Sequence, residues 1–398
     1  MAAAGGAAQP PRQYKLAPQS ELRVEVPPDA PVRVRLVAGT AEVFGTELPP
    51  EGWVPVPPRS KIAIFTWHGA TVELDGVSES EYTSDETPMV VYVNTHAILD
   101  ARRARARAAT AQGAPPEASQ GPRVIIVGPS DSGKSTLCKM LLSWAAKQGW
   151  KPTYVDLDIG QGSITIPGCI SATPIEKPID IVDGIPLEMP LAYFYGHPSP
   201  SVSPDVYRAL MKELAQTLDK QFSGNSESRA AGMIINTMGW VENLGLELLH
   251  NSIEIFKANE KLWKMLKDAA KNKPNIDVVK LHKSEGVVPR NPKYRQKTRS
   301  FRIKEYFYGI ANDLAPHSNP VADPTRLVAV NISTDMVHTV LAVSYAKEPD
   351  EIVSSNVAGF IHVTDVDIQR KKLTYIAPCP GDLPSKLLIA SSLTWYEA

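Results

Sequence analysis

Residues 123–136 have the sequence RVIIVGPSDSGKST, in which an apolar run leads directly into a glycine-rich loop. The run 123–127 is mostly β-branched, as in a strand that is buried on both faces of a parallel sheet. Residues 128–135 fit the pattern G-x-x-x-x-G-K-[S/T], and a helix is predicted over 134–148. A strand, a glycine-rich loop and a helix in this order form the context that a phosphate-binding loop requires.

The residue types in this loop predict a nucleotide site. Gly133 allows successive backbone N–H groups to turn inward and form a nest for anionic oxygens. The dipole of the following helix adds positive potential at the same point. We expect Lys134 to reach the β- and γ-phosphates of a nucleotide and the Ser135 hydroxyl to ligate Mg²⁺.

Alternating strands and helices surround the loop. Further buried strands are predicted over 153–157 and 230–236, and a helix over 244–259. This alternation predicts an α/β fold class, with a central kinase-like parallel sheet of the P-loop NTPase type in a domain that spans 123–315.

Two β-rich regions flank that domain. After an Ala/Gly/Pro-rich tail at 1–13, which is predicted to be disordered, short alternating runs predict an N-terminal β-domain over 14–98. Residues 99–122 contain an Ala-rich helix with four arginines and then a linker, which we interpret as a solvated connector. Short β-runs return near residue 327 and predict a mostly β domain over 316–398.

The composition excludes several classes of protein. The chain has 398 residues, 43% of them hydrophobic, and a net charge of −1, which excludes wholesale disorder. No apolar run approaches the roughly 20 residues of a membrane span, so no membrane partner is expected. The N-terminal residues lack the apolar core of a signal peptide, and the 3 cysteines form no CxxC pair, which favours reduced thiols in the cytosol or nucleus. With so little net charge, a nucleic acid would have to bind at a local basic patch.

Carboxylates follow the second predicted strand of the central domain. Asp158 lies just past this strand, where the ends of parallel strands face the ligand crevice. It is positioned to hold a Mg²⁺-bound water or to accept a proton from an attacking hydroxyl. Asp156 alternates with it and would instead pair with Lys134 or a helix end. A carboxylate beside Gln161, without a water-orienting Glu, favours transfer to an acceptor hydroxyl over hydrolysis.

Two later features fit an acceptor that is a nucleic acid. Trp240 follows the predicted strand 230–236 and would offer a flat face to a nucleobase, although core packing is the alternative. Residues 286–302 contain four Arg and two Lys. In a helical lid, Arg295 and Arg299 share one face and, with Arg290, would neutralise phosphate charge. The alternative is an ordinary solvated charged face.

Together, GPSDSGKST, the DLDIGQG segment, NTMGW, the Arg-rich segment ending in EYFYG, and the early ELRVEV and FGTELP segments resemble the Clp-type polyribonucleotide 5′-hydroxyl kinases. The resemblance extends from about residue 14 to the end. It implies that ATP binds between the N-terminal and central domains. The resemblance implies that Glu21 and Lys61 contact the nucleotide, and that its phosphates are bound by Asp131, Ser132, Gly133, Lys134, Ser135 and Thr136. It implies that Asp158 activates the RNA 5′-hydroxyl and that Gln161 and Trp240 contact the RNA. The lid arginines that it implies are Arg290, Arg295 and Arg299.

The resemblance also implies a cellular role. Members of this family are the ATP-binding subunit of the nuclear machinery for pre-mRNA 3′-end cleavage and polyadenylation, where they bind a Pcf-type scaffold. Some also associate with the tRNA-splicing endonuclease. We therefore expect a nuclear RNA 5′-hydroxyl kinase that uses ATP and Mg²⁺. The alternatives are a catalytically silent ATP-bound scaffold and a metabolic small-molecule kinase, and the Trp and Arg features argue against the latter.

One segment departs from the expected pattern. The predicted helix 244–259 runs directly into a second predicted helix over 260–273, and no apolar run separates Phe256 from Leu262. A strand of the sheet is expected between two such helices. We hypothesise that the chain carries an internal deletion there, which would destabilise the sheet. Alternatively, residues 253–256 are recruited as a makeshift strand.

Overall fold

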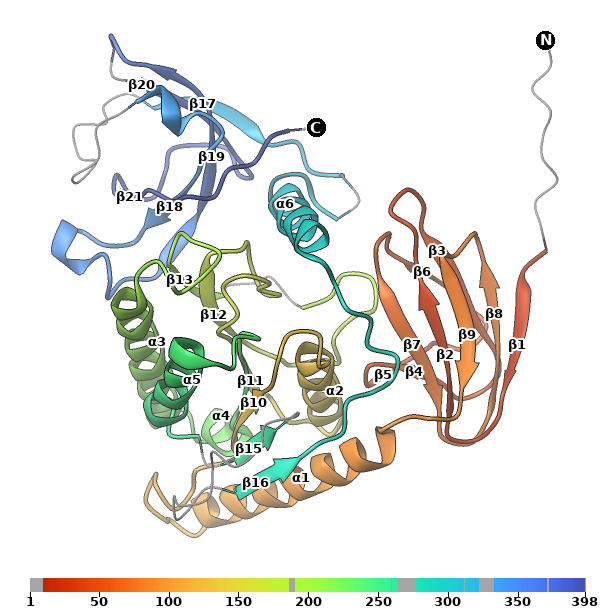
Figure 1. Ribbon diagram of the computed structural model, residues 1–398. Coiled ribbons are helices and arrows are strands. Elements are labelled where there is room, and N and C mark those ends of the chain that lie inside the picture. The colour runs from red at the N-terminus through yellow and green to blue at the C-terminus, as the bar shows by residue number, and fades with distance from the viewer. Residues whose placement is uncertain are drawn as a thin grey trace, which may run out of the picture.

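The computed structural model describes residues 10–185, 190–258, 260–263, 277–310, 312–321, 333–370 and 372–397. An N-terminal β-sandwich, a central α/β domain and a C-terminal β domain follow one another along the chain (Figure 1). No helix of these described ranges is both long and apolar enough to cross a bilayer.

The N-terminal domain consists of two antiparallel sheets that enclose an apolar core. Leu22 and Val24 are buried in that core, as the alternation predicts, but Arg23 between them is buried as well. The first sheet has the order β1 (Arg12–Leu16), β8 (Ala70–Asp75), β3 (Val32–Gly39), β6 (Trp53–Val56). The second has the order β5 (Thr46–Glu47), β4 (Glu42–Val43), β7 (Lys61–Thr66), β2 (Ser20–Glu25), β9 (Ser80–Ser84). Strand β1 begins at Arg12, so the prediction of a disordered tail up to residue 13 is wrong for its last two residues, while residues 1–9 lie outside the described ranges.

The central domain is built on a seven-stranded sheet. Its order is β13 (Leu191–Phe194), β12 (Cys169–Pro174), β11 (Thr153–Asp156), β14 (Met233–Asn236), β10 (Arg123–Val127), β15 (Glu260–Trp263), β16 (Asp277–Lys280). Strands β11 to β16 in this order run parallel, as predicted, but β12 and β13 pair antiparallel and form one edge. The sheet is therefore mixed. The predicted strand 230–236 starts late, because its first two residues end the short helix α4 (Ser226–Ala231).

Helices cover both faces of this sheet (Figure 1). Val124 and Ile126 of β10 face a core that includes α1 (Met89–Ala111) and α2 (Lys134–Lys147). Ile125 and Val127 face the opposite core, with α3 (Pro204–Gly224) and α5 (Asn243–Ile255). The bare apolar run thus folds as a strand that is buried on both sides, which places the phosphate loop at its carboxyl end.

Helix α1 corrects the interpretation of residues 99–122 as a solvated connector. It begins at Met89, inside the predicted N-terminal domain, and Met89, Tyr92 and Leu99 belong to the central core. Arg103 is fully buried, and its Nε donates to the carbonyl of Ala231 over 3.0 Å. The charged residues of the helix suggested solvent on all sides, but one arginine lies on the face that contacts the sheet domain.

Strand β15 corrects the helix predicted from residue 260. Residues 260–263 pair in parallel with β10 and β16, with Glu260 opposite Val124 and Asp277. A strand therefore occupies the position predicted to be empty, although it is short and its sequence, EKLW, has little β character. The makeshift strand proposed for 253–256 is also wrong, because α5 extends to Ile255. The remainder of the predicted helix, 264–273, lies outside the described residues.

The C-terminal domain is a five-stranded antiparallel sheet. Its order is β17 (His317–Val321), β20 (Lys372–Ala377), β19 (Val357–Asp367), β18 (Val340–Ser344), β21 (Leu388–Ile389). The predicted run 327–332 lies outside the described residues. Helix α6 (Pro292–Tyr308) joins this domain to the centre, and its Phe307 stacks on Trp395 with ring centroids 5.9 Å apart. One end of the lid helix is thereby anchored in the C-terminal core.

Candidate active site

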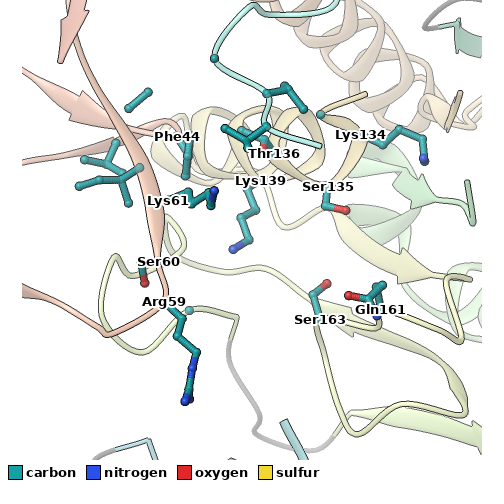
Figure 2. A pocket seen from close by; sticks show the side chains of 18 of the residues that line it. Phe44, Arg59, Ser60, Lys61, Lys134, Ser135, Thr136, Lys139, Gln161 and Ser163 are labelled. Atoms are coloured by element: carbon teal, nitrogen blue, oxygen red, sulfur yellow. The ribbon is translucent and has the colours of Figure 1, made fainter. Parts of the chain in front are cut away.

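A cavity of about 550 Å³ lies between the N-terminal sandwich, the phosphate loop and α6. It brings together all of the residues expected to bind the nucleotide or RNA or to act in catalysis, except Trp240. These are Glu21, Lys61, Asp131, Ser132, Gly133, Lys134, Ser135, Thr136, Asp158, Gln161, Arg290, Arg295 and Arg299. Figure 2 shows several of them around the opening, with Lys61 entering from the N-terminal domain and Ser135 from α2.

The phosphate loop has the backbone that its sequence predicts. Gly133 adopts a φ of 79° immediately before α2, a conformation that glycine reaches without strain. Lys134 is buried, and its Nζ donates to the carbonyls of Gly128 and Pro129 over 2.9 and 3.0 Å. Burial lowers the pKa of this ammonium. The amino end of α2 and a buried cation thus converge at one point of the cavity.

Arg295 and Arg299 lie over this loop on α6, and Arg290 lies just before the helix. Asn291 caps the helix by accepting a hydrogen bond from the Tyr294 N–H over 2.7 Å, and Pro292 opens its first turn. The guanidinium of Arg295 donates to Asp131 over 2.6 Å. Arg299, one turn further along, has a pKa that burial and the Arg295 charge lower. The structure therefore places the predicted lid against the phosphate loop.

The two carboxylates at the end of β11 have different environments. Asp158 lines the cavity, and its Oδ1 accepts hydrogen bonds from the N–H groups of Gly160 and Gln161 over 3.1 and 3.0 Å. Burial, together with the charge of Asp156, raises the pKa of Asp158 to about 6. A carboxylate with that pKa is mostly ionised near pH 7 and yet basic enough to accept a proton.

Asp156, in contrast, is held by hydrogen bonds from neighbouring residues of the protein. Its two carboxylate oxygens accept hydrogen bonds from Asn236 Nδ2 over 3.0 Å, Ser163 Oγ over 2.7 Å and the Asp158 N–H over 3.1 Å. The side chain of Lys134 is directed at loop carbonyls, so the pairing of Asp156 with Lys134 that was left open does not form. Asp156 orients the strand end that presents Asp158.

Residues of the N-terminal domain form the wall of the cavity that faces the phosphate loop. Glu21 is buried and accepts hydrogen bonds from Arg23 Nε over 2.6 Å and from Thr87 Oγ1 over 3.1 Å. Lys61 is paired with Glu25 over 2.5 Å. Both predicted residues thus line the cavity, and their contact with a nucleotide stays a prediction.

Trp240 is the residue that the cavity does not include. Its neighbour Gly239 lines the cavity, whereas Trp240 is half-buried against the core on the α3–α5 side of the sheet. The ring lies so close to Gly245 that a Cβ there would be 2.4 Å from the Trp240 Cγ. The core packing named as the alternative therefore accounts for part of this side chain, and its role in stacking RNA stays a prediction.

Sequence reasoning missed other cavity residues. Arg23 and Arg59 reach the cavity from the sandwich, Arg302 from α6 and Lys139 from α2. Of these, Lys139 was detectable, because it follows Ser135 by four residues and so shares its face of the helix. Within the described residues, no group of three or more His, Cys, Asp or Glu could hold a metal ion.

Three family models match successive parts of the chain. They are the N-terminal beta-sandwich domain of polyadenylation factor at 15–106, the mRNA cleavage and polyadenylation factor CLP1 P-loop at 128–309, and the pre-mRNA cleavage complex II protein Clp1 at 294–397. A CLP1 homolog of Arabidopsis thaliana is 57% identical, over 97% of this chain and 95% of its own length. The chain belongs to the Clp1 family. The polyribonucleotide 5′-hydroxyl-kinase Clp1 of Gallus gallus is 37% identical, over 97% of this chain and 96% of its own length.

Solved structures of Clp1 chains share the fold. The Clp1p chain of a wild-type Clp1p–Pcf11p complex superposes with a TM-score of 0.84 at 24% identity, covering 98% of this chain and 99% of that one. A second structure, which concerns the Pcf11p–Clp1p interface and ATP loss in a point mutant, gives a TM-score of 0.85. At this identity the likeness establishes the three-domain architecture.

The length of the alignments bears on the hypothesis of an internal deletion. The Arabidopsis relative aligns over 423 positions, 25 more than the 398 residues of this chain. At least that many positions therefore lie opposite gaps in this chain. The alignment length does not place these gaps along the chain, so a deletion near residue 259 stays a hypothesis.

Proposed function

We propose that this Clp1-family chain is an ATP-dependent polyribonucleotide 5′-hydroxyl kinase that serves in pre-mRNA 3′-end cleavage. The single observation that carries the proposal is the cavity in which the phosphate loop, Asp158 and the arginines of α6 meet. A triphosphate site alone would fit many proteins. A base of suitable pKa and a cationic lid facing the same loop fit phosphoryl transfer to a hydroxyl.

The reaction is an in-line displacement at the γ-phosphorus of ATP. The RNA 5′-oxygen forms a bond to that phosphorus while the bond to the β-phosphate bridging oxygen breaks, and ADP leaves. Asp158 accepts the proton of the 5′-hydroxyl. Lys134 and the N–H groups at the start of α2 bind the phosphates, and Arg290, Arg295 and Arg299 stabilise the charge on the transferring group.

A magnesium ion fits the donors present. Ser135 presents an exposed hydroxyl at the cavity, and Asp158, with a pKa of about 6, is mostly ionised near pH 7. Mg²⁺ prefers such oxygen ligands and keeps several waters, so two protein oxygens beside substrate phosphates suffice. When bound, Mg²⁺ would neutralise phosphate charge; Ser135 and Asp158 are the residues that would hold it.

The acceptor and the partners complete the proposal. We assign RNA as the acceptor, with Gln161 at the cavity and Trp240 just outside it as its contacts. The relatives are mRNA 3′-end processing factors, and a structural neighbour is bound to Pcf11p, which supports a nuclear location and a Pcf-type scaffold partner. Association with the tRNA-splicing endonuclease is the further expectation that came with the family resemblance.

The experiment is transfer of label from γ-labelled ATP to a 5′-hydroxyl RNA oligomer. We expect labelled RNA with the wild-type chain and none with Lys134→Ala or Asp158→Asn. Lys151→Met, a change at a surface lysine outside the cavity, is the matched control and should retain activity. Tight ATP binding without any labelled RNA would contradict the kinase and indicate the scaffold alternative.

A further inference from the structure

Lys139 is a cavity residue to which the reaction above assigns no task. Its side chain extends from α2 into the cavity, on the side that faces Lys61 and Ser163 (Figure 2). Among the described residues it has neither a hydrogen-bond acceptor nor an ion-pair partner. Lys61, by comparison, is paired with Glu25. A half-buried lysine with no acceptor on the wall of a cavity is complementary to an anionic ligand.

The helix geometry puts the phosphate loop within reach of Lys139. Lys139 and Ser135 lie one turn apart on the same face of α2, about 6 Å along the axis at 1.5 Å per residue. Side chains on a helix lean towards its amino end and cover the preceding turn. The ammonium of Lys139 can therefore reach back along the turn that begins with Ser135, where the phosphates of a nucleotide would lie.

The charges that face Lys139 are mainly positive. Arg302 and Arg290 act on it from the lid segment, and Asp156 acts on it from β11. Asp156 does not neutralise it, because its carboxylate is already used by Asn236, Ser163 and the backbone of Asp158. Burial and the two arginines lower the pKa of Lys139 to about 8. An anion bound beside Lys139 would be attracted by its charge and by those of Arg290 and Arg302, of which Arg302 is also paired with Glu305 over 2.7 Å.

We propose that Lys139 is a second lysine ligand of the nucleotide, binding a non-bridging phosphate oxygen of the chain that the phosphate loop holds. The inference rests on the proposed function only in that ATP enters this cavity. It does not require that the phosphoryl group is transferred. A phosphodiester of the acceptor RNA offers the same chemistry and is distinguished by the test.

The test compares Lys139→Met and Lys139→Arg with the wild-type chain by calorimetry. Because methionine keeps the length of the stem without the charge, Lys139→Met should weaken binding of Mg-ATP and Mg-ADP by about 10-fold or more. Adenosine binding should change by less than about 2-fold, and Lys139→Arg should restore most of the nucleotide affinity. The surface change Lys151→Met controls for the loss of one positive charge.

Two results would overturn the inference. Unchanged nucleotide affinity together with a raised KM for 5′-hydroxyl RNA would assign Lys139 to the acceptor. Unchanged nucleotide affinity together with an unchanged KM for RNA would remove Lys139 from the site.

Thermal melting of each variant shows whether the fold is kept, and the arginine variant keeps the test valid if the methionine variant fails to fold. Failure of the kinase proposal itself would appear separately, as wild-type protein that binds ATP and labels no RNA.

Discussion

The guanidinium of Arg295 donates to the carboxylate of Asp131 over 2.6 Å, which joins the middle of the phosphate loop to the first turns of the lid helix. The same Asp131 oxygen accepts the backbone N–H of Arg290 over 2.9 Å. One carboxylate thus holds two points of the lid segment. Asp131 itself adopts a φ of 54°, a left-handed conformation that Asp and Asn tolerate better than most residues.

Replacing Asp131 with Asn should loosen the lid without disturbing the loop backbone. Asn keeps the shape and tolerates the positive φ, but it removes the charge that attracts Arg295. We expect trypsin to cut within residues 290–302 several times faster than in the wild-type chain. An unchanged cleavage rate would mean that packing of α6, and not this ion pair, holds the lid.

The buried histidine of the C-terminal domain should make stability depend on pH. Burial lowers the pKa of His362, whose Nε2 is 3.0 Å from the Trp395 carbonyl. In the unfolded chain this histidine has a pKa near 6.5, whereas in the folded chain its pKa is lower. The neutral, buried His362 therefore makes its full contribution to stability above pH 6.5, and that contribution is lost as the pH falls through the lower pKa of the folded state. We expect the free energy of unfolding to fall between pH 7 and 5, and to fall less in His362→Gln. The same change at the exposed His68 should leave the slope as it is.

Trp240 tests whether the acceptor extends beyond the cavity. If a base stacks on the exposed part of its ring, Trp240→Leu should weaken RNA binding by about 1–3 kcal/mol and leave ATP affinity unchanged. The measurement is a titration of labelled 5′-hydroxyl RNA followed by polarisation. A loss of thermal stability with unaltered RNA affinity would assign Trp240 entirely to its packing on Gly245.

Arg103 should be important for stability because it is buried in the interface between α1 and the sheet domain. Arg103→Ala removes the hydrogen bond to the Ala231 carbonyl and leaves a cavity, so we expect a loss of about 2–4 kcal/mol in the free energy of unfolding. The exposed Arg105 is the matched control on the same helix, and Arg105→Ala should change stability by less than about 0.5 kcal/mol. Equal effects of the two changes would contradict the burial of Arg103.

Much of the candidate site was predictable because phosphate binding imposes a fixed pattern on consecutive residues. The loop and its lysine follow β10, and Asp158 follows β11, the strand on the other side of β14, so the local sequence after each strand is enough to identify them. Arg295 and Arg299 were also predictable, since their spacing of four residues places them on one helix face, while Arg290 lies just before the helix. Arg302 could have been added by the same reasoning, because it follows Arg299 by three residues on one helix. Arg59 was not predictable, because only the packing of the sandwich brings it to the cavity.

The errors in the fold came from segments whose tertiary context overrides local preference. Residues 260–263, EKLW, favour a helix, yet pairing with β10 and β16 makes them a strand. The alternation of strands and helices in the sequence did not predict that β12 and β13 pair antiparallel at one edge of the sheet. The arginines of α1 suggested solvent all around, and only the observed packing shows that Arg103 is inside.

The position of α1 constrains how the molecule can be divided. Since Met89, Tyr92 and Leu99 belong to the apolar core beneath the sheet, a truncation that starts at residue 99 or 123 would remove part or all of this helix and expose that core. A shortened protein intended to retain phosphoryl transfer should begin upstream of Met89, and even then it would lack the cavity wall that carries Glu21 and Lys61. The sandwich is thus an integral part of the cavity, and its removal would leave the cavity open to solvent on one side.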